Sequence, residues 1–365
     1  INIYVMENSK MVDTYSLKIG GLRINELFEE SLDSPKDYVQ VIREYLTPFF
    51  ETLSDAIPEK LSQCIVSGNE IQTIASMCNA TNSLDFSIME RTAFTKMYKK
   101  AKEKGTEAIS MEYDIPQEEV EVLLPSLIVL NRLLKYTVND SILLSNVLLS
   151  DAVMFEMLFP KEASFVVKAY EEFTLQSATS IAERFGRDIG HISRVSSVAI
   201  EIYDKMKKLH GYKSRERTLL QVSAILQDIG KYVNVKNHAL LSYNTITNLD
   251  IVGINDHERL IIATVCYYHN GNIPSMDSPI YNQLSQEDRV MVSKLAAILQ
   301  ISNAINTSHS PKFEQVSVNM KNGKLNIYLT TLKNINLEKW AFIAKSKLFR
   351  EVYGLNATII KRGVL

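Results

Sequence analysis

Leu226-Gln227-Asp228-Ile229-Gly230-Lys231 is the stretch around which polar, metal-capable side chains gather. Strand patterns stop after Pro160, and apolar residues then recur with a helical period over 165–184, 191–209, 215–229, 256–268 and 287–306. The sequence therefore predicts a separate all-α unit around this stretch. It holds all six histidines of the chain, which are His191, His210, His238, His257, His269 and His309.

Within this unit, His191 lies on one predicted helix, Asp228 on a later one, and His238 and Asn303 follow. The arrangement resembles the HD superfamily, whose helical phosphohydrolases place a His, a His-Asp pair and a distant Asp around a divalent metal. Imidazole and carboxylate groups suit that chemistry because both donate lone pairs to a cation and so lower the pKa of bound water.

The match to the HD pattern is incomplete. Gln227 stands where the paired histidine would be, and Asn303 stands where the distant carboxylate would be. A neutral amide is a poor ligand for a transition metal. We therefore expect a degenerate HD-like site at His191, Gln227, Asp228, His238 and Asn303, with no metal, in which His191 and Asp228 hydrogen-bond inside the bundle. His210, His257, His269 and His309 show no recognisable spacing and are predicted to lie at the surface or at helix ends.

N-terminal to the helical unit, strand and helix patterns alternate. The sequence predicts a hairpin over 1–19 that turns at Asn8-Ser9, ahead of Gly20-Gly21, and a short strand at 64–67 that runs into Gly68-Asn69 and a helix. A further strand is expected at 141–145. Helices are expected at 35–54, 87–104, 116–136 and 150–159.

The C-terminal tail changes character again. Strand patterns at 315–320 and 325–330 flank Asn322-Gly323, which is a strong hairpin signal. A helix at 337–352 and a last strand at 357–360 are expected to follow. The sequence thus predicts three domains, at 1–160, 161–310 and 311–365.

Composition excludes several classes of protein. The 365 residues include 46% hydrophobic and 22% charged residues, which is typical of globular proteins and excludes a disordered chain or a charge-dense nucleic-acid arm. The net charge of -2 gives no general attraction for polyanions. The three cysteines lack metal-type spacing, and no stretch is apolar enough to cross a bilayer, so we expect a cytoplasmic protein without a membrane partner.

The order of these units, with four short segments, resembles the Ppx/GppA phosphatase family of exopolyphosphatases and guanosine pentaphosphate phosphatases. The segments are 16–23, with Gly20, Gly21 and Arg23; 65–71, with Ser67, Gly68 and Asn69; 115–126; and 145–148. The resemblance implies an α/β plus all-α protein. It would comprise the second lobe of an actin-like (ribonuclease H-like) domain, an HD-like helical domain and a small α+β subdomain.

The resemblance also implies a function. The chain would be part of a phosphohydrolase that releases terminal phosphate from inorganic polyphosphate or guanosine pentaphosphate, with Mg²⁺ as cofactor. Gly20, Gly21, Arg23, Ser67, Gly68 and Asn69 would face the phosphate. A glycine turn at a helix start presents backbone N–H groups to an anion, which is consistent with that role. The family's first lobe, with its acidic residue, is expected upstream, so no catalytic residue is expected in this chain, which alone would be inactive. A homodimer is also implied, and no nucleic-acid partner is expected.

Two other functions fit the sequence. The first is a non-catalytic module that binds polyphosphate or an alarmone, which Asn69, Gln227 and Asn303 favour. The second is an HD-type nucleotide phosphohydrolase in the helical unit. Lysine clusters at 96–104 and 205–208 are interpreted as solvated helix faces, because Glu103 and Asp204 interrupt them.

Overall fold

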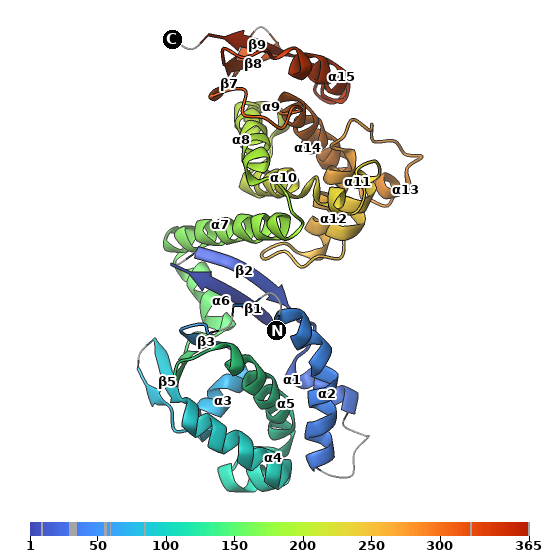
Figure 1. The fold of residues 1–365 in the computed structure, drawn as a ribbon. Coiled ribbons are helices and arrows are strands. Elements are labelled where there is room, and N and C mark those ends of the chain that lie inside the picture. Colours follow the sequence, from blue (N-terminus) through green and yellow to red (C-terminus); the bar gives the residue numbers. More distant parts are fainter. Residues whose placement is uncertain are drawn as a thin grey trace. The chain divides into compact units, whose positions relative to one another are not determined.

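The computed structural model describes residues 1–8, 10–28, 35–54, 57–58, 60–83, 85–321 and 323–363. The protein is a mixed α/β protein in which helices predominate (Figure 1). It divides into two compact units. Unit 1 comprises residues 1–5 and 15–166, and unit 2 comprises residues 6–14 and 167–365. Within the described residues, none of the helices combines the length and the apolar character that crossing a membrane requires.

Unit 1 alternates strands and helices, as its sequence pattern predicts. Its first two strands pair as a hairpin, which also supplies residues 6–14 to unit 2. The predicted turn residue Ser9 lies outside the described residues. The elements are β1 (Asn2–Glu7), β2 (Lys10–Ser16), α1 (Gly21–Phe28), α2 (Pro35–Ser54), β3 (Cys64–Val66), α3 (Asn69–Met77), β4 (Thr81–Asn82), β5 (Phe86–Glu90), α4 (Arg91–Tyr113), α5 (Gln117–Leu133), the 3₁₀ turn η1 (Leu134–Tyr136), β6 (Ser141–Ser145) and α6 (Leu149–Leu158).

The larger sheet of unit 1 has four strands in the order β3-β6-β5-β4. Strands β3 and β6 run parallel, with Ile65 opposite Leu143, whereas β5 runs antiparallel to β6. On β6, Ile142 and Leu144 are buried beneath the helices, and they belong to one core with Met89 of β5 and Phe94 of α4. Parallel pairing places the carboxyl ends of β3 and β6 side by side.

The predicted helix at 87–104 is wrong at its start. Ser87 to Glu90 belong to β5, and the helix α4 begins only at Arg91. Ser87 and Met89 are buried while Phe86 and Glu90 are exposed, so the burial period is two and not 3.6. The Arg91 side chain donates hydrogen bonds to the carbonyl oxygens of the segment before β6, which fixes the helix start beside the sheet.

Unit 2 is a helical bundle followed by a small sheet. The tip of the β1-β2 hairpin packs on its first helix, where Gln176 Oε1 accepts from the Met11 N–H and Ser180 Oγ donates to the Val12 carbonyl. The helices are α7 (Pro160–Arg184), which begins in unit 1, α8 (Ile189–Lys205), α9 (Lys207–His210), α10 (Ser214–Leu226), η2 (Ile229–Tyr232), α11 (His238–Ile246), α12 (Asp256–Tyr268), α13 (Pro279–Asn282) and α14 (Gln286–Ile305).

The tail of unit 2 is a three-stranded sheet with one helix. Strands β7 (Gln315–Lys321) and β8 (Lys324–Thr330) form the predicted hairpin, and β9 (Asn356–Arg362) adds in parallel to β8. Asn322 of the predicted turn lies outside the described residues. The helix α15 (Asn336–Tyr353) packs against α14, and the tail shares one hydrophobic core with the bundle. The division into three domains stays a prediction.

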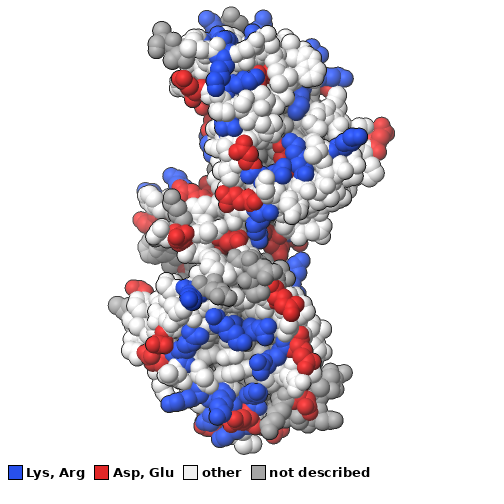
Figure 2. Space-filling view, viewed as in Figure 1, with Lys and Arg blue, Asp and Glu red and all other residues white. Residues whose placement is uncertain are grey.

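Basic side chains gather on one face of unit 1, in the lower part of the view in Figure 2. Helix α4 alone carries Lys96, Lys99, Lys100, Lys102 and Lys104. Glu112 neutralises part of this charge, since it pairs with Lys100 and lies 3.6 Å from the Lys104 ammonium. This pairing is consistent with a solvated helix face.

Candidate functional site

The first candidate site is the turn between β3 and α3 in unit 1. Gly68 has φ 152° and ψ 160°, a conformation that residues with a Cβ rarely adopt, and α3 begins at the next residue. Ser67 and Asn69 are exposed on either side of it. The turn lies at the carboxyl end of β3, next to that of the parallel strand β6, which is where open α/β sheets bind ligands.

Two neighbours define the chemistry of this turn. Gln72 of α3 donates a hydrogen bond to the Ser145 carbonyl at 3.0 Å, so the start of α3 is tied to the end of β6. The Glu70 carboxylate lies beside the turn, 3.6 Å from where a Cβ on Gly68 would stand. A carboxylate there repels a bare phosphate, but it suits a hard cation such as Mg²⁺, which binds one or two carboxylates together with phosphate oxygens.

The other predicted phosphate-binding residues lie on α1. Gly21 is buried against α5, where a Cβ would stand 2.5 Å from the Val122 carbonyl oxygen and 2.6 Å from Ser126 Oγ. Close helix packing therefore explains this glycine. A Cβ on Gly20, by contrast, would have no atom within 4 Å among the described residues. The Arg23 guanidinium donates to the Lys18 carbonyl at 3.0 Å. No hydrogen bond or ion pair within the described part of unit 1 joins these residues to the turn at Gly68.

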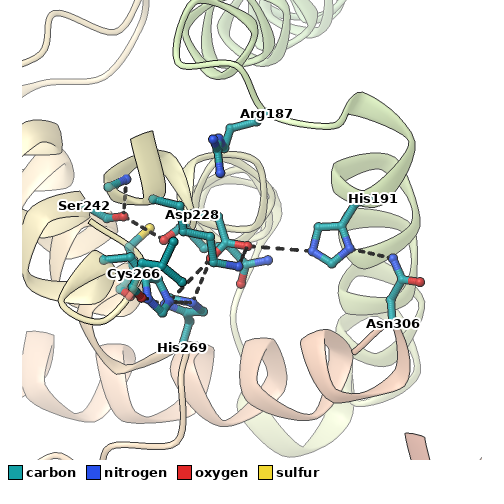
Figure 3. Close-up of polar contacts among 12 residues, drawn as sticks. Arg187, His191, Asp228, Ser242, Cys266, His269 and Asn306 are labelled. Carbon is teal, nitrogen blue, oxygen red and sulfur yellow. Dashed lines mark hydrogen bonds and ion pairs between the residues drawn. The ribbon is translucent and has the colours of Figure 1, made fainter. Parts of the chain in front are cut away.

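The second candidate site is a buried cluster in unit 2, where three segments far apart in sequence meet (Figure 3). Asp228 lies just before η2, His238 begins α11, and His269 directly follows α12. His269 Nε2 lies 3.3 Å from Asp228 Oδ1, His238 Nε2 lies 3.6 Å from the same oxygen, and the two Nε2 atoms are 3.3 Å apart. The exposed fractions of the three residues are 5%, 6% and 0%.

Hydrogen bonds on the far side of each ring determine which nitrogen carries the proton. His238 Nδ1 lies 2.7 Å from the Val235 carbonyl oxygen, and His269 Nδ1 lies 2.5 Å from the Cys266 carbonyl oxygen. A carbonyl oxygen only accepts, so each Nδ1 is the protonated donor. In the neutral rings both Nε2 atoms therefore present lone pairs to each other and to Asp228.

Asp228 is held as an anion. Burial alone would raise the pKa of this carboxyl, but hydrogen bonding from His269 in its doubly protonated form and the charge of Lys231 outweigh burial and hold the pKa well below its ordinary range. Lys231 Nζ lies 2.7 Å from Oδ2, which leaves Oδ1 facing the two imidazoles. Burial, with the neighbouring ring of His269, lowers the pKa of His238.

His191 approaches this cluster from α8. Its Nε2 lies 3.8 Å from Asp228 Oδ2, is buried and has no hydrogen-bond partner among the described residues, while Nδ1 lies 2.7 Å from the Asn306 amide nitrogen. The ring stacks on His309 at 3.9 Å. Burial and the adjacent His309 ring lower the pKa of His191 to about 4. His191 and Asp228 thus lie close together, but they do not form a hydrogen bond with each other.

The structure adds two details to the HD-like pattern. Asn306, one turn beyond Asn303 and directly after α14, contacts His191. Gln227 is 1% exposed, and neither of its amide atoms has a hydrogen-bond partner in the part of the chain that the structure describes.

The remaining histidines lie at the surface or at helix ends, as predicted, but the two at helix ends, His210 and His269, are buried. His269 does end a helix, but it is fully buried at the centre of the cluster, and His210 is 5% exposed. His257 does lie at the surface, where it pairs with Asp288, and His309 is exposed. Sequence spacing could not reveal His269, because its partners come from separate helices. The one signal was a histidine directly after an apolar helix that ends at Tyr267-Tyr268.

Comparison with known proteins finds one family to which this bundle is similar. Residues 175–348, slightly less than half of the chain, match the family described as Ppx/GppA phosphatase, domain III. This range runs from α7 to α15 and contains the whole Asp228 cluster.

Solved structures show fainter likeness. An exopolyphosphatase from Cytophaga hutchinsonii is 16% identical with a TM-score of 0.36, and the match covers 43% of this chain and 53% of that one. A Ppx/GppA family member from Aquifex aeolicus is 17% identical with a TM-score of 0.35, covering 44% and 53%. The chain thus spans about half the length of these proteins. Residues 175–348 are therefore similar to domain III of the Ppx/GppA phosphatases.

Proposed function

We propose that the protein is part of a phosphohydrolase that releases terminal phosphate from inorganic polyphosphate or guanosine pentaphosphate. The match of residues 175–348 to Ppx/GppA phosphatase domain III carries this proposal. In it, unit 1 is the second lobe of an actin-like domain, and unit 2 is an HD-like domain with a small α+β tail. The activity is proposed for the whole protein, because this chain spans about half the length of the solved relatives.

The turn at Ser67, Gly68 and Asn69 is the phosphate-facing element of this proposal. Backbone N–H groups at the start of α3 and the positive end of its dipole favour an anion there. Gly68 lets the chain pass close to a phosphate without a side chain in the way. These groups would bind and orient the terminal phosphate and stabilise the charge that develops on its oxygens.

The Glu70 carboxylate beside the turn fits a Mg²⁺ ion shared with the substrate. Bound there, the ion would neutralise phosphate charge during attack by water. We propose that the residues that activate the water lie outside this chain, and that these 365 residues alone release no phosphate.

The Glu70 position also supports a second function, in which the protein binds polyphosphate or an alarmone without hydrolysing it. Asn69 follows Gly68, where a second glycine would allow closer approach of a phosphate. The binding module and the enzyme differ in turnover, so one assay separates them.

The test is Mg²⁺-dependent phosphate release from long-chain polyphosphate and from guanosine pentaphosphate, by this chain and by the full-length gene product. Gly68→Ala strains the turn by about 1–3 kcal/mol. Its control is Gly354→Ala, a glycine with φ 65° and open space around it in the tail. We expect release by the full-length protein only, with a KM several-fold higher in Gly68→Ala and unchanged in Gly354→Ala.

Each other outcome has a defined meaning. Binding of polyphosphate by the full-length protein without release would replace the enzyme by the binding module. Release by this chain alone, abolished by Asp228→Asn, would move the chemistry to the helical unit as an HD-type phosphohydrolase. If the full-length protein neither binds polyphosphate nor releases phosphate, the proposal is overturned.

A further inference from the structure

The cluster of Asp228, His238 and His269 brings electron-rich atoms face to face when both of its rings are neutral. Three electron-rich atoms, Asp228 Oδ1 and the two Nε2 atoms, converge in a space buried from water. Both imidazoles have their protons on Nδ1, where backbone carbonyls accept them. Lone pairs that point at one another repel, so the space between these atoms calls for a cation.

The separations of the three atoms suit one small metal ion. Ligands held about 2.0–2.1 Å from a tetrahedral ion lie roughly 3.3–3.4 Å from one another. The separations here are 3.3, 3.3 and 3.6 Å. A single point can therefore lie at coordination distance from all three atoms without movement of the backbone.

The surroundings hold the ligands in place. Histidines that bind metals usually donate their other N–H to a backbone carbonyl or a carboxylate, which fixes the tautomer and the ring orientation. Val235 and Cys266 accept these bonds here. Lys231 binds the other oxygen of Asp228, so the carboxylate is oriented with Oδ1 toward the rings.

His191 supplies an independent observation. It is 4% exposed, and its Nε2 has no hydrogen-bond partner. Figure 3 shows this nitrogen pointing from α8 toward Asp228, at the side where Oδ2 lies 3.8 Å away. An unpartnered buried imidazole aimed at the cluster indicates a polar occupant between them, such as a water on the metal.

We propose that Asp228, His238 and His269 bind one divalent transition-metal ion of borderline softness, such as Zn²⁺. Two imidazoles and one carboxylate select such an ion over Mg²⁺ or Ca²⁺, which prefer oxygen ligands. Three protein ligands leave the fourth tetrahedral position for water on the His191 side. This site revises the expectation of no metal, which rested on Gln227 and Asn303, because neither residue belongs to the ligand set. The site is independent of phosphate release at Gly68.

The test uses the full chain, stripped with a chelator and titrated with Zn²⁺ against a chromophoric competitor. We expect one equivalent of Zn²⁺ to bind, and His238→Ala, His269→Ala and Asp228→Asn each to weaken binding at least about 100-fold. The matched control is His257→Ala, whose side chain is 63% exposed and pairs with Asp288 outside the cluster. It should bind Zn²⁺ like the wild type. Unchanged affinity in the three variants would overturn the proposal.

A second measurement covers the case in which a variant fails to fold. In the wild-type protein, Zn²⁺ should shift the imidazole resonances of His238 and His269 in NMR spectra and leave their Nδ1–H protons in place. Co²⁺ in the same site should give the intense visible absorption of a four-coordinate ion. A wild-type protein that binds neither ion, with a proton shared between the rings instead, would refute the metal site.

Discussion

His238 Nε2 and His269 Nε2 lie 3.3 Å apart, and each ring donates its other nitrogen's proton to a backbone carbonyl. The two residues are 31 positions apart in sequence and join the start of α11 to the end of α12. Asp228, which follows the end of α10, contacts His269 at the same point. An ion there would link three segments of the bundle, which makes the site testable through stability as well as binding.

Removal of metal should lower the stability of the wild-type protein. A ligand that binds only the folded state adds about 2.7 kcal/mol at a concentration 100-fold above its Kd. We expect a strong chelator to lower the Tm of the zinc-loaded protein and to leave the Tm of His269→Ala unchanged. Differential scanning calorimetry with and without the chelator measures both. Equal shifts in the two proteins would contradict this prediction.

Alanine substitutions at the neighbouring residues Gly20 and Gly21 should affect stability differently. A methyl group on Gly21 meets the Val122 carbonyl oxygen at 2.5 Å, so Gly21→Ala must push α1 away from α5. Overpacking of this kind costs about 1–3 kcal/mol. Gly20→Ala meets no atom within 4 Å and should leave the free energy of unfolding unchanged. Urea unfolding of both variants measures the difference, and equal destabilisation would show that packing does not explain Gly21.

Gln227 and Gln300 are both 1% exposed but differ in hydrogen bonding. Both amide atoms of Gln227 lack partners, whereas Gln300 Nε2 donates to the Tyr268 and Asn272 carbonyls at 2.7 and 2.9 Å. An unsatisfied buried polar group costs about 1–3 kcal/mol. We therefore expect Gln227→Met to raise the unfolding midpoint and Gln300→Met to lower it. A lower midpoint for Gln227→Met would mean that a bound water or ion satisfies its amide.

His210 should make stability depend on pH. Its Nδ1 accepts from the Tyr212 N–H at 3.0 Å and its Nε2 donates to the Tyr203 carbonyl at 2.9 Å, so a second proton would break the first bond. Burial lowers the pKa of His210 below 6.5, and Lys294 adds to this, while the Tyr203 bond and the charges of Asp204 and Glu216 oppose it.

The sign of that dependence follows from proton binding. Between the lowered folded pKa of His210 and 6.5, the unfolded chain binds more protons than the folded one. The contribution of His210 to stability is therefore complete above pH 6.5 and is lost as the pH falls. His210→Asn should flatten the dependence of the unfolding midpoint on pH below 6.5, whereas the control His257→Asn should keep the wild-type slope. Identical slopes in all three proteins would rule out His210 as the cause.

Much of the fold could be predicted from periodicity. Helices α2 and α12 begin and end where the sequence pattern places them, and the β7-β8 hairpin forms around Gly323 as expected. Strand β5 was mistaken for the start of α4, because Ile88 and Met89 continue directly into a helical pattern at Arg91. A local sequence pattern cannot place the boundary between a strand and a helix when no turn residue separates them.

The buried cluster could be predicted only in part. His191, Asp228 and His238 stood out by their order along the chain, but His269 and Asn306 did not. Both reach the cluster because α12 and α14 pack across the bundle, which no local spacing encodes. The conclusion from Gln227 that a metal is absent also assumed one particular ligand set.

The most direct measurement is an anomalous difference map from crystals of the protein grown with Zn²⁺, collected at the zinc absorption edge. We expect one strong peak about 2.0–2.2 Å from Asp228 Oδ1 and from the Nε2 atoms of His238 and His269. Crystals of a known zinc protein, treated in the same way, show that the map can detect bound zinc. A map that passes this control but has no peak among the three residues would contradict the metal site.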